Sequence, residues 1–246
     1  MIKQTMAALL LSTAVASAAE FSIGTVTTEA DSIEASGIEL SFQNKSNGIE
    51  YGGTLISADD EGGNAVRGDA ESLIDNLANG VSLSDIAINL PDGNYTYNKF
   101  EDKSKQIYVG KEINPGLTVG VQVRANDVTY ESVDLDVNGS TGLVYVGEAK
   151  ANDTDINGYA AYTISNGKLT GRAQLNTAGE IGIKGEAKIG NGFSAYFGYE
   201  AREASFDFEG GSIYSSPRTT RITPDSGSED ADLETTSFGI KYNLKF

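Results

Sequence analysis

The stretch Leu233–Phe246, LETTSFGIKYNLKF, decides the fold that we expect for this chain. From Phe238 to Phe246 the large apolar residues occupy every second position, with glycine, asparagine or lysine between them. A period of two is the period of a β-strand, because successive side chains point to opposite faces of a sheet. The stretch therefore predicts a strand with one wholly apolar face and a second face that carries Lys241 and Lys245.

This strand ends on an aromatic residue, with further large apolar residues at alternate positions before it. In this respect it resembles the closing strand of bacterial outer-membrane β-barrels. The resemblance implies that Tyr242, Leu244 and Phe246 form the signal read by the barrel-assembly machinery. A soluble amphipathic strand that ends on phenylalanine by chance is the alternative, so the rest of the chain has to decide.

Residues 1–19 have the pattern of a secretory signal peptide. Lys3 supplies the positive charge, Thr5 to Ala16 is apolar, and Ala16-Ser17-Ala18 offers a small-residue cleavage site. The apolar run is shorter than the ~20 residues that a transmembrane helix needs. We expect residues 1–19 to be removed and residues 20–246 to form one barrel domain in the cell outer membrane.

The composition narrows the class of protein. The chain has no cysteine and therefore no disulfide framework or thiol chemistry. No long apolar run follows residue 19, which excludes a helical membrane protein but not a barrel, whose strands show lipid only every second side chain. The net charge of −17 argues against nucleic acid as a partner, because phosphate binding needs a basic face.

Alternating segments recur along the whole chain and are separated by turn signals of the Asn-Gly or Pro-Gly type. We count about twelve strands, within a range of ten to fourteen, and predict an all-β, antiparallel, up-and-down transmembrane barrel. If both termini lie in the periplasm, the short turns fall on the periplasmic side. These turns are Asn44–Asn47, Asn114–Gly116, Asn138–Ser140, Ser165–Gly167 and Gly190–Gly192.

The same order of strands places two long polar regions, 59–103 and 209–232, outside the cell as extracellular loops. Within the first, Asp69–Asn79 predicts a short helix capped by Asp69. Region 59–103 has two interpretations: it folds into the lumen as a constriction, as in the porin family, or it stays exposed at the surface.

Placing the apolar residues toward lipid leaves charged residues facing the lumen, since each lysine or arginine near the lipid midplane would cost ~2–4 kcal/mol. The predicted inward set is Glu39, Glu50, Glu112, Arg124, Asp134, Asp136, Glu148, Lys150, Lys168, Arg172, Glu180, Lys184, Glu186, Lys188, Glu200, Arg202, Lys241 and Lys245. These are the candidate pore-lining residues.

Two functions fit such an interior. One is a porin-like channel for passive diffusion of small hydrophilic solutes, weakly cation-preferring because the long loops are acidic. The other is a structural or adhesive barrel with a closed, salt-bridged interior and loops that act at the cell surface. The expected partners are outer-membrane lipid, lipopolysaccharide, the assembly machinery and small hydrophilic solutes. Resemblance to the general porins adds a homotrimer as one arrangement.

The sequence carries no sign of an enzyme or a cofactor site. The barrel enzymes that the family includes use a catalytic histidine, and this chain has none. The stretch Asp153-Thr-Asp155-Ile-Asn157-Gly158 matches the first half of a calcium loop, but Ile164 stands where the bidentate glutamate is required. Asp153, Asp155 and Asn157 are thus an incomplete ligand set, and we predict no metal site.

Overall fold

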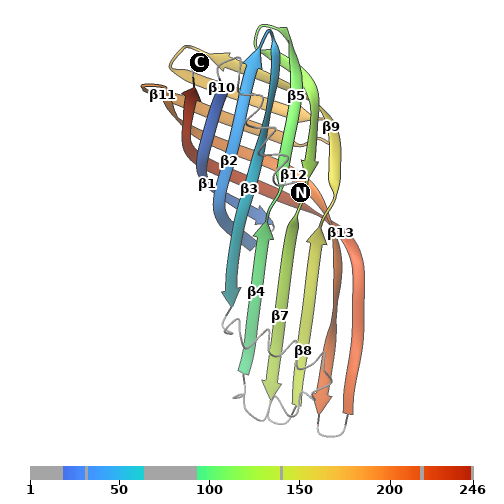
Figure 1. The fold of residues 1–246 in the computed structure, drawn as a ribbon. Coiled ribbons are helices and arrows are strands. Elements are labelled where there is room, and N and C mark those ends of the chain that lie inside the picture. Colours follow the sequence, from blue (N-terminus) through green and yellow to red (C-terminus); the bar gives the residue numbers. More distant parts are fainter. Residues whose placement is uncertain (1–18, 31–32, 64–92, 139–140, 217–218, 245–246) are drawn as a thin grey trace, which may run out of the picture.

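The computed structural model describes residues 19–30, 33–63, 93–138, 141–216 and 219–244, and these residues form thirteen β-strands (Figure 1). No helix in these ranges is long and apolar enough to cross a membrane. The strands are β1 Ala19–Ala30, β2 Ile33–Ser46, β3 Ile49–Gly63, β4 Gly93–Asp102, β5 Lys105–Asn114, β6 Leu117–Ala125, β7 Val128–Asn138, β8 Thr141–Ala151, β9 Thr154–Ser165, β10 Leu169–Asn176, β11 Ile181–Gly190, β12 Phe193–Ser216 and β13 Thr219–Leu244.

Ten of these strands close into an antiparallel ring in the order β1, β2, β3, β5, β6, β9, β10, β11, β12, β13. The first and last strands close it, with a register that runs from Ala19↔Leu244 to Ala30↔Leu233. The predicted antiparallel transmembrane barrel is therefore confirmed, and the ring size lies within the predicted range. The final strand recognised in the sequence is the one that closes the barrel.

The remaining three strands, β4, β7 and β8, belong to an extension of the barrel wall. They bridge the far ends of β3 and β12, and β12 and β13 themselves continue as a hairpin to Ser216 and Thr219. Figure 1 shows β4, β7, β8, β12 and β13 projecting together beyond the barrel. We call this sheet, which the end of β3 joins through its pairing with β4, the extension.

The extension corrects two predictions about loops. Residues 59–63 and 93–102 are strand, and 209–216 and 219–232 lie in the paired strands of a hairpin rather than in a loop. Alternation failed to show this because both faces of a strand can meet water outside the membrane. Residues 64–92, including the predicted helix 69–79, lie outside the described residues, as does the predicted signal apart from Ala19, which opens β1.

The turn predicted on the periplasmic side at Asn138–Ser140 belongs to the opposite end of the molecule. The chain passes from β6 directly into β7, so β7 ends at Asn138, and β8 starts at Thr141, at the tip of the extension. The other four short turns lie at the end of the barrel that holds Ala19 and Leu244, as predicted. Two of them place an asparagine in the left-handed region, Asn47 and Asn191, directly before a glycine.

The outer surface of the barrel is apolar, as the facing argument predicts. Large apolar side chains that are about half exposed surround it and mark the lipid-facing band. They include Ile23, Ile38, Leu40, Val109, Val121, Ile183, Phe238 and Ile240. Aromatic rings gather at the end with the termini, where Phe21 contacts Phe42 and Phe193 contacts Tyr242. Such a girdle is typical of the membrane interface.

Candidate functional site

The lumen near the termini is lined by charges of both signs around a cavity of about 590 Å³. Lys241 on β13 forms ion pairs with Glu20 on β1 and Glu186 on β11, each at 2.5 Å between Nζ and a carboxylate oxygen. Lys45 pairs with Glu112 at 3.0 Å. These pairs balance part of the charge at this mouth.

Deeper in the lumen, charges alternate with tyrosine rings. Arg172 pairs with Glu50 at 2.7 Å, and the Tyr196 hydroxyl donates a hydrogen bond of 3.0 Å to Glu39. The Lys184 ammonium lies 4.5 Å from the centre of the Tyr196 ring. A cation over an aromatic face is attracted by the ring quadrupole, so this contact helps to hold Lys184 against Tyr196.

Inward glycines make room for these rings. A Cβ at Gly120 would lie 2.2 Å from the Val109 carbonyl oxygen and 2.7 Å from the Tyr159 ring. At Gly24 it would lie 2.5 Å from the Tyr196 hydroxyl. The tyrosines therefore lie flat against the strands and fill the lumen where glycine leaves space.

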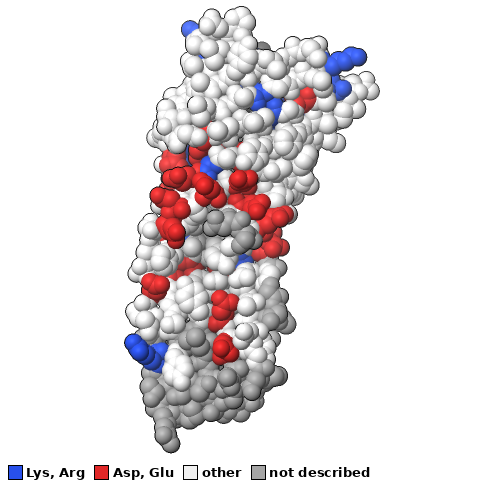
Figure 2. All heavy atoms as spheres, turned by 180° about the vertical axis from the view of Figure 1, so that it is seen from behind, with Lys and Arg blue, Asp and Glu red and all other residues white. Residues whose placement is uncertain are grey.

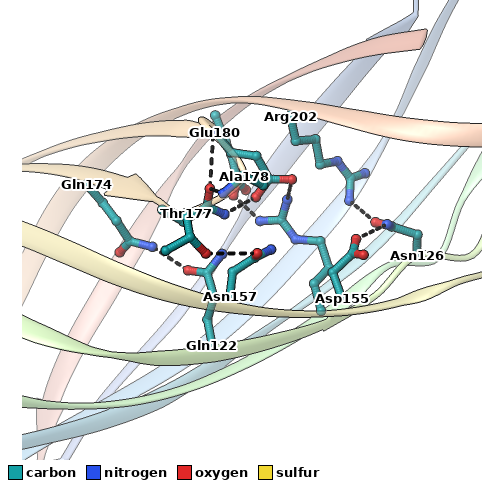
Figure 3. A network of polar contacts seen from close by, with 12 residues as sticks. Gln122, Asn126, Asp155, Asn157, Gln174, Thr177, Ala178, Glu180 and Arg202 are labelled. Carbon is teal, nitrogen blue, oxygen red and sulfur yellow. Dashed lines mark hydrogen bonds and ion pairs between the residues drawn. The ribbon is translucent and has the colours of Figure 1, made fainter. Parts of the chain in front are cut away.

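A polar network occupies the lumen next to the extension (Figure 3). Arg124 contacts Glu180 at 3.5 Å and also pairs with Glu200. Gln174 donates to Gln122 at 2.6 Å. Gln122 and Arg124 lie on β6, Gln174 on β10 and Glu200 on β12, so the network joins several strands of the wall rather than following one.

The deepest ion pair joins β12 to the junction of β4 and β5. Arg202 donates to Asp102 at 2.8 Å and to Asn126 at 2.9 Å, and the two charged side chains are 1% and 0% exposed. Asp102 also accepts hydrogen bonds from the Thr28 hydroxyl at 2.9 Å and the Ser104 amide at 3.0 Å. A buried carboxylate with this many donors is well compensated for its lost hydration.

An apolar cluster lies in the lumen beside this pair, since Asp102 is directly opposite Ala58 and Val128, and Arg202 is directly opposite Leu233. It takes at least one inward residue from each of eight strands, β1, β2, β3, β4, β7, β8, β12 and β13, which pair around the barrel at this level. Its members are Val26, Ala35, Ala58, Phe100, Val128, Ala151, Ala204, Phe206 and Leu233, all less than 9% exposed. We call it the apolar layer. It separates the charged lumen from the extension.

The structure places most of the predicted pore-lining residues in the lumen. Buried or half-buried there are Glu39, Glu50, Arg124, Arg172, Glu180, Lys184, Glu186, Glu200, Arg202 and Lys241, while Glu112 and Lys188 lie at the mouth near the termini. Within this set Arg124 pairs with Glu180 and Glu200, Arg172 pairs with Glu50, and Lys241 pairs with Glu186. Lys245 lies outside the described residues.

Five predicted pore-lining residues lie elsewhere. Glu148 and Lys150 pair with each other at 2.6 Å on the face of β8 opposite to the buried Ala151. Asp134 and Asp136 are exposed on β7 in the extension, beyond the closed ring, and Lys168 is exposed in a turn. The argument that charged side chains must point away from lipid gave the wrong direction for the four strand residues. Their strands, β7 and β8, lie outside the membrane, where no lipid fixes which side chains point inward.

Sequence reasoning missed several lumen residues. Asp102 was assigned to a loop, although it accepts the deepest ion pair. Tyr108, Tyr159 and Tyr196 were missed because only charged residues were counted, yet each occupies an inward position of the same alternation. The parity of the strands would have identified all three tyrosines.

Two side chains of the calcium-like stretch accept hydrogen bonds from residues that flank neighbouring strands. Asp155 accepts from Asn126 at 3.1 Å, and Asn157 accepts from Thr177 at 3.2 Å. Within the described ranges, no group of three or more histidine, cysteine, aspartate or glutamate residues is arranged to hold a metal ion.

Exposed carboxylates gather where the barrel meets the extension, and Figure 2 shows them as a band across the middle of the molecule. We call this set the acid belt. It includes Glu29, Glu34, Asp59, Glu203, Asp232 and Glu234. Register places like charges directly opposite each other, as in Glu29↔Glu234 and Glu203↔Asp232. Such a belt marks the level at which the outer surface leaves lipid and meets water.

No protein-family model and no curated protein sequence matches the chain. Among solved structures, it aligns with Ail of Yersinia pestis, an attachment invasion locus protein, at 8% identity and a TM-score of 0.32, covering 93% of this chain and 99% of that one. It aligns with CarO of Acinetobacter baumannii at 9% identity and a TM-score of 0.37, covering 90% and 97%. It aligns with the outer membrane protease OmpT of Escherichia coli at 8% and 0.38, covering 92% and 96%.

These similarities are too low to carry an argument about function. The outer-membrane β-barrel that the sequence resembles is instead supported by the chain itself. Its antiparallel ring is closed by the first and last strands, and it is surrounded by an exposed apolar band with an aromatic girdle.

Proposed function

We propose that this chain is a closed outer-membrane barrel that acts at the cell surface through its extension, rather than a channel. The apolar layer carries this proposal. It takes buried side chains from eight strands around the wall, at the level of the Arg202–Asp102 pair and next to the extension. A dry apolar constriction excludes ions because they would lose hydration without gaining a polar partner.

The charges of the lumen support the same conclusion. In an open porin the wall charges face water, whereas Arg124, Arg202 and Asp102 are buried and bonded to groups on other strands. Such cross-lumen pairs tie opposite walls together and stabilise the barrel. The passive-diffusion function expected from the sequence remains a prediction, and the apolar layer argues against it.

The extension is the part of the protein available to other molecules. With the termini and four of the short turns in the periplasm, the extension projects from the cell beyond the acid belt. Its partners at the membrane would be lipid and lipopolysaccharide, and assembly would use Tyr242, Leu244 and Phe246 as the recognition signal. The porin-like homotrimer is not needed for a barrel that is closed as a monomer.

Planar-bilayer recordings test the closed lumen. We expect the wild-type protein to show no stepwise conductance. We expect Phe100→Ser combined with Leu233→Ser to conduct, because both residues are almost fully buried in the apolar layer. Phe208→Ser, above the layer, is the control and should stay silent. Regular wild-type conductance steps would overturn the proposal and support the diffusion channel.

Labelling of intact cells tests the direction of the extension. The chain has no cysteine, so a single introduced thiol reports its own position. Ser226→Cys, exposed on β13 in the extension, should react with a membrane-impermeant maleimide. Asn191→Cys, in a turn at the opposite end, should react only after the outer membrane is permeabilised. The reverse pattern would contradict the proposed orientation.

A further inference from the structure

A cleft of about 450 Å³ lies on the extension, at the outer side of the apolar layer. Aromatic side chains from four strands line it: Phe100, Tyr130, Tyr145, Phe206 and Phe208. Phe100 and Phe206 belong to the apolar layer and fix the base, whereas Tyr145 is 38% exposed. We call this the aromatic cleft. Its base is rigid because eight strands hold the layer beneath it.

The rim of the aromatic cleft is acidic. Asp225, Glu229 and Asp230 of β13 line it, and its lining contains no lysine or arginine. Within the described part of the chain, none of the three forms an ion pair, whereas Glu148, which also lines the cleft, is paired with Lys150. The cleft therefore combines aromatic faces with unbalanced negative charge.

This combination favours a ligand that carries a positive charge on an apolar body. Aromatic faces are negative and attract organic cations, most strongly where water is partly excluded. The rim carboxylates add a longer-range attraction and repel anions of the same shape. The volume falls within the ~300–1,000 Å³ of small-molecule sites. A neutral apolar ligand would gain from the rings alone.

We propose that the aromatic cleft binds small organic cations with an apolar body, such as alkylated ammonium compounds. This inference deepens the proposed surface function by naming a ligand class. It rests on that function only for the location of the extension, because the cleft does not require a sealed lumen.

Titration calorimetry of the full mature chain in phosphatidylcholine nanodiscs tests it, with empty nanodiscs subtracted. The probes are benzyltrimethylammonium, the neutral benzyl alcohol and the anion benzenesulfonate, which share one aromatic ring. We expect the cation to bind at least about tenfold more tightly than the anion, with the neutral compound between them. Equal binding of cation and anion, or no binding of the cation, would overturn the inference.

Two charge-matched variants locate the site. Asp225→Asn/Glu229→Gln/Asp230→Asn removes three exposed carboxylates from the rim and should weaken cation binding about tenfold. Glu29→Gln/Glu34→Gln/Glu234→Gln removes three from the acid belt and should leave it unchanged. Tyr145→Ser should weaken binding of both cation and neutral probe. Equal loss in the two triple variants would assign binding to general surface charge and reject the cleft.

A deletion separates an external ligand from the chain's own residues. Residues 64–92 are replaced by a short glycine-serine linker, and binding is measured again. Binding that is the same before and after supports the inference. Binding that appears only after the replacement would show that this segment is the natural occupant and would overturn it. Bilayer conductance depends on the lumen alone. A cleft that does not bind cations and a barrel that is not closed therefore give different results.

Discussion

The barrel and the extension share the long strands β12 and β13 but obey opposite rules of facing. On β12, Phe197 points outward and is exposed in the barrel, whereas Phe206 points inward and is buried in the apolar layer. In the barrel, Arg124 and Lys241 point into the lumen, while on β8 Lys150 points away from the buried face. The difference follows the solvent: lipid surrounds the barrel and water surrounds the extension. A strand that leaves the membrane keeps its neighbouring strands, but its apolar side chains then face inward instead of outward.

The largest effect is expected at the junction of the two regions. Asp102→Ala leaves the Arg202 guanidinium buried without its carboxylate, which we expect to lower the free energy of unfolding by about 3–5 kcal/mol. Denaturant titration of the protein refolded into vesicles measures this. Asp102→Leu combined with Arg202→Met should recover most of the loss, because no charge is then buried. A single variant as stable as the wild type would show that the pair does not tie the regions together.

The rule that outward side chains must be apolar in the barrel but not in the extension can be tested by placing one charge in each region. Val121→Arg puts a cation into lipid from a side chain that is 47% exposed, and it should cost about 2–4 kcal/mol of unfolding free energy. Ser226→Arg puts the same charge on the exposed extension and should change it by less than about 0.5 kcal/mol. Equal losses in the two variants would mean that the acid belt is not the boundary of the membrane.

Alternation alone suggests that arginine would be tolerated at the neighbouring inward position, Gln122. In the structure Gln122 is 2% exposed and bonded to Gln174, so we expect an arginine there to disrupt this contact. The lipid constraint made the direction of most barrel side chains predictable from the sequence. The contents of the lumen were not predictable, because they depend on how far apart opposite walls lie. Asp102 and Arg202 are a hundred residues apart in the chain, and only ring closure brings them together.

The extension was the least predictable part for a related reason. Water on the outside imposes no apolar pattern. Region 209–232 therefore had the polar composition of a loop, although its described residues 209–216 and 219–232 lie in paired strands. The breaks between β4 and β5, β6 and β7, and β8 and β9 added to this, since each lies at the boundary between the two regions. The closing strand, by contrast, was predictable. Lipid requires its outer face to be apolar, and as the last strand it closes the barrel against the first.

A smaller effect than these is expected when a glycine that faces the filled lumen is replaced, with a glycine that faces lipid as its comparison. Gly120→Ala should lower the free energy of unfolding by about 1–3 kcal/mol, because the added Cβ meets the Val109 carbonyl and the Tyr159 ring. Gly185→Ala is the control, since a Cβ there has no atom within 4 Å, and it should be neutral or slightly stabilising. Both are measured by denaturant titration. A neutral Gly120 variant would mean that the tyrosines do not pack tightly across the lumen.

The smallest effect concerns the acid belt, where the two regions meet. Glu29 lies directly opposite Glu34 on one neighbouring strand and Glu234 on the other, and all three are exposed. Like charges opposite each other destabilise a sheet, so Glu29→Gln should raise the free energy of unfolding by a few tenths of a kcal/mol in dilute salt. The gain should vanish toward 1 M salt, where the Debye length is ~3 Å and the repulsion is screened. Ser205→Ala, exposed on β12 in the extension, carries no charge and should show no such salt dependence. Denaturant titrations at low and high salt measure both variants. A Glu29 variant that is less stable than the wild type at low salt would show that the belt binds cations tightly enough to reverse its own repulsion.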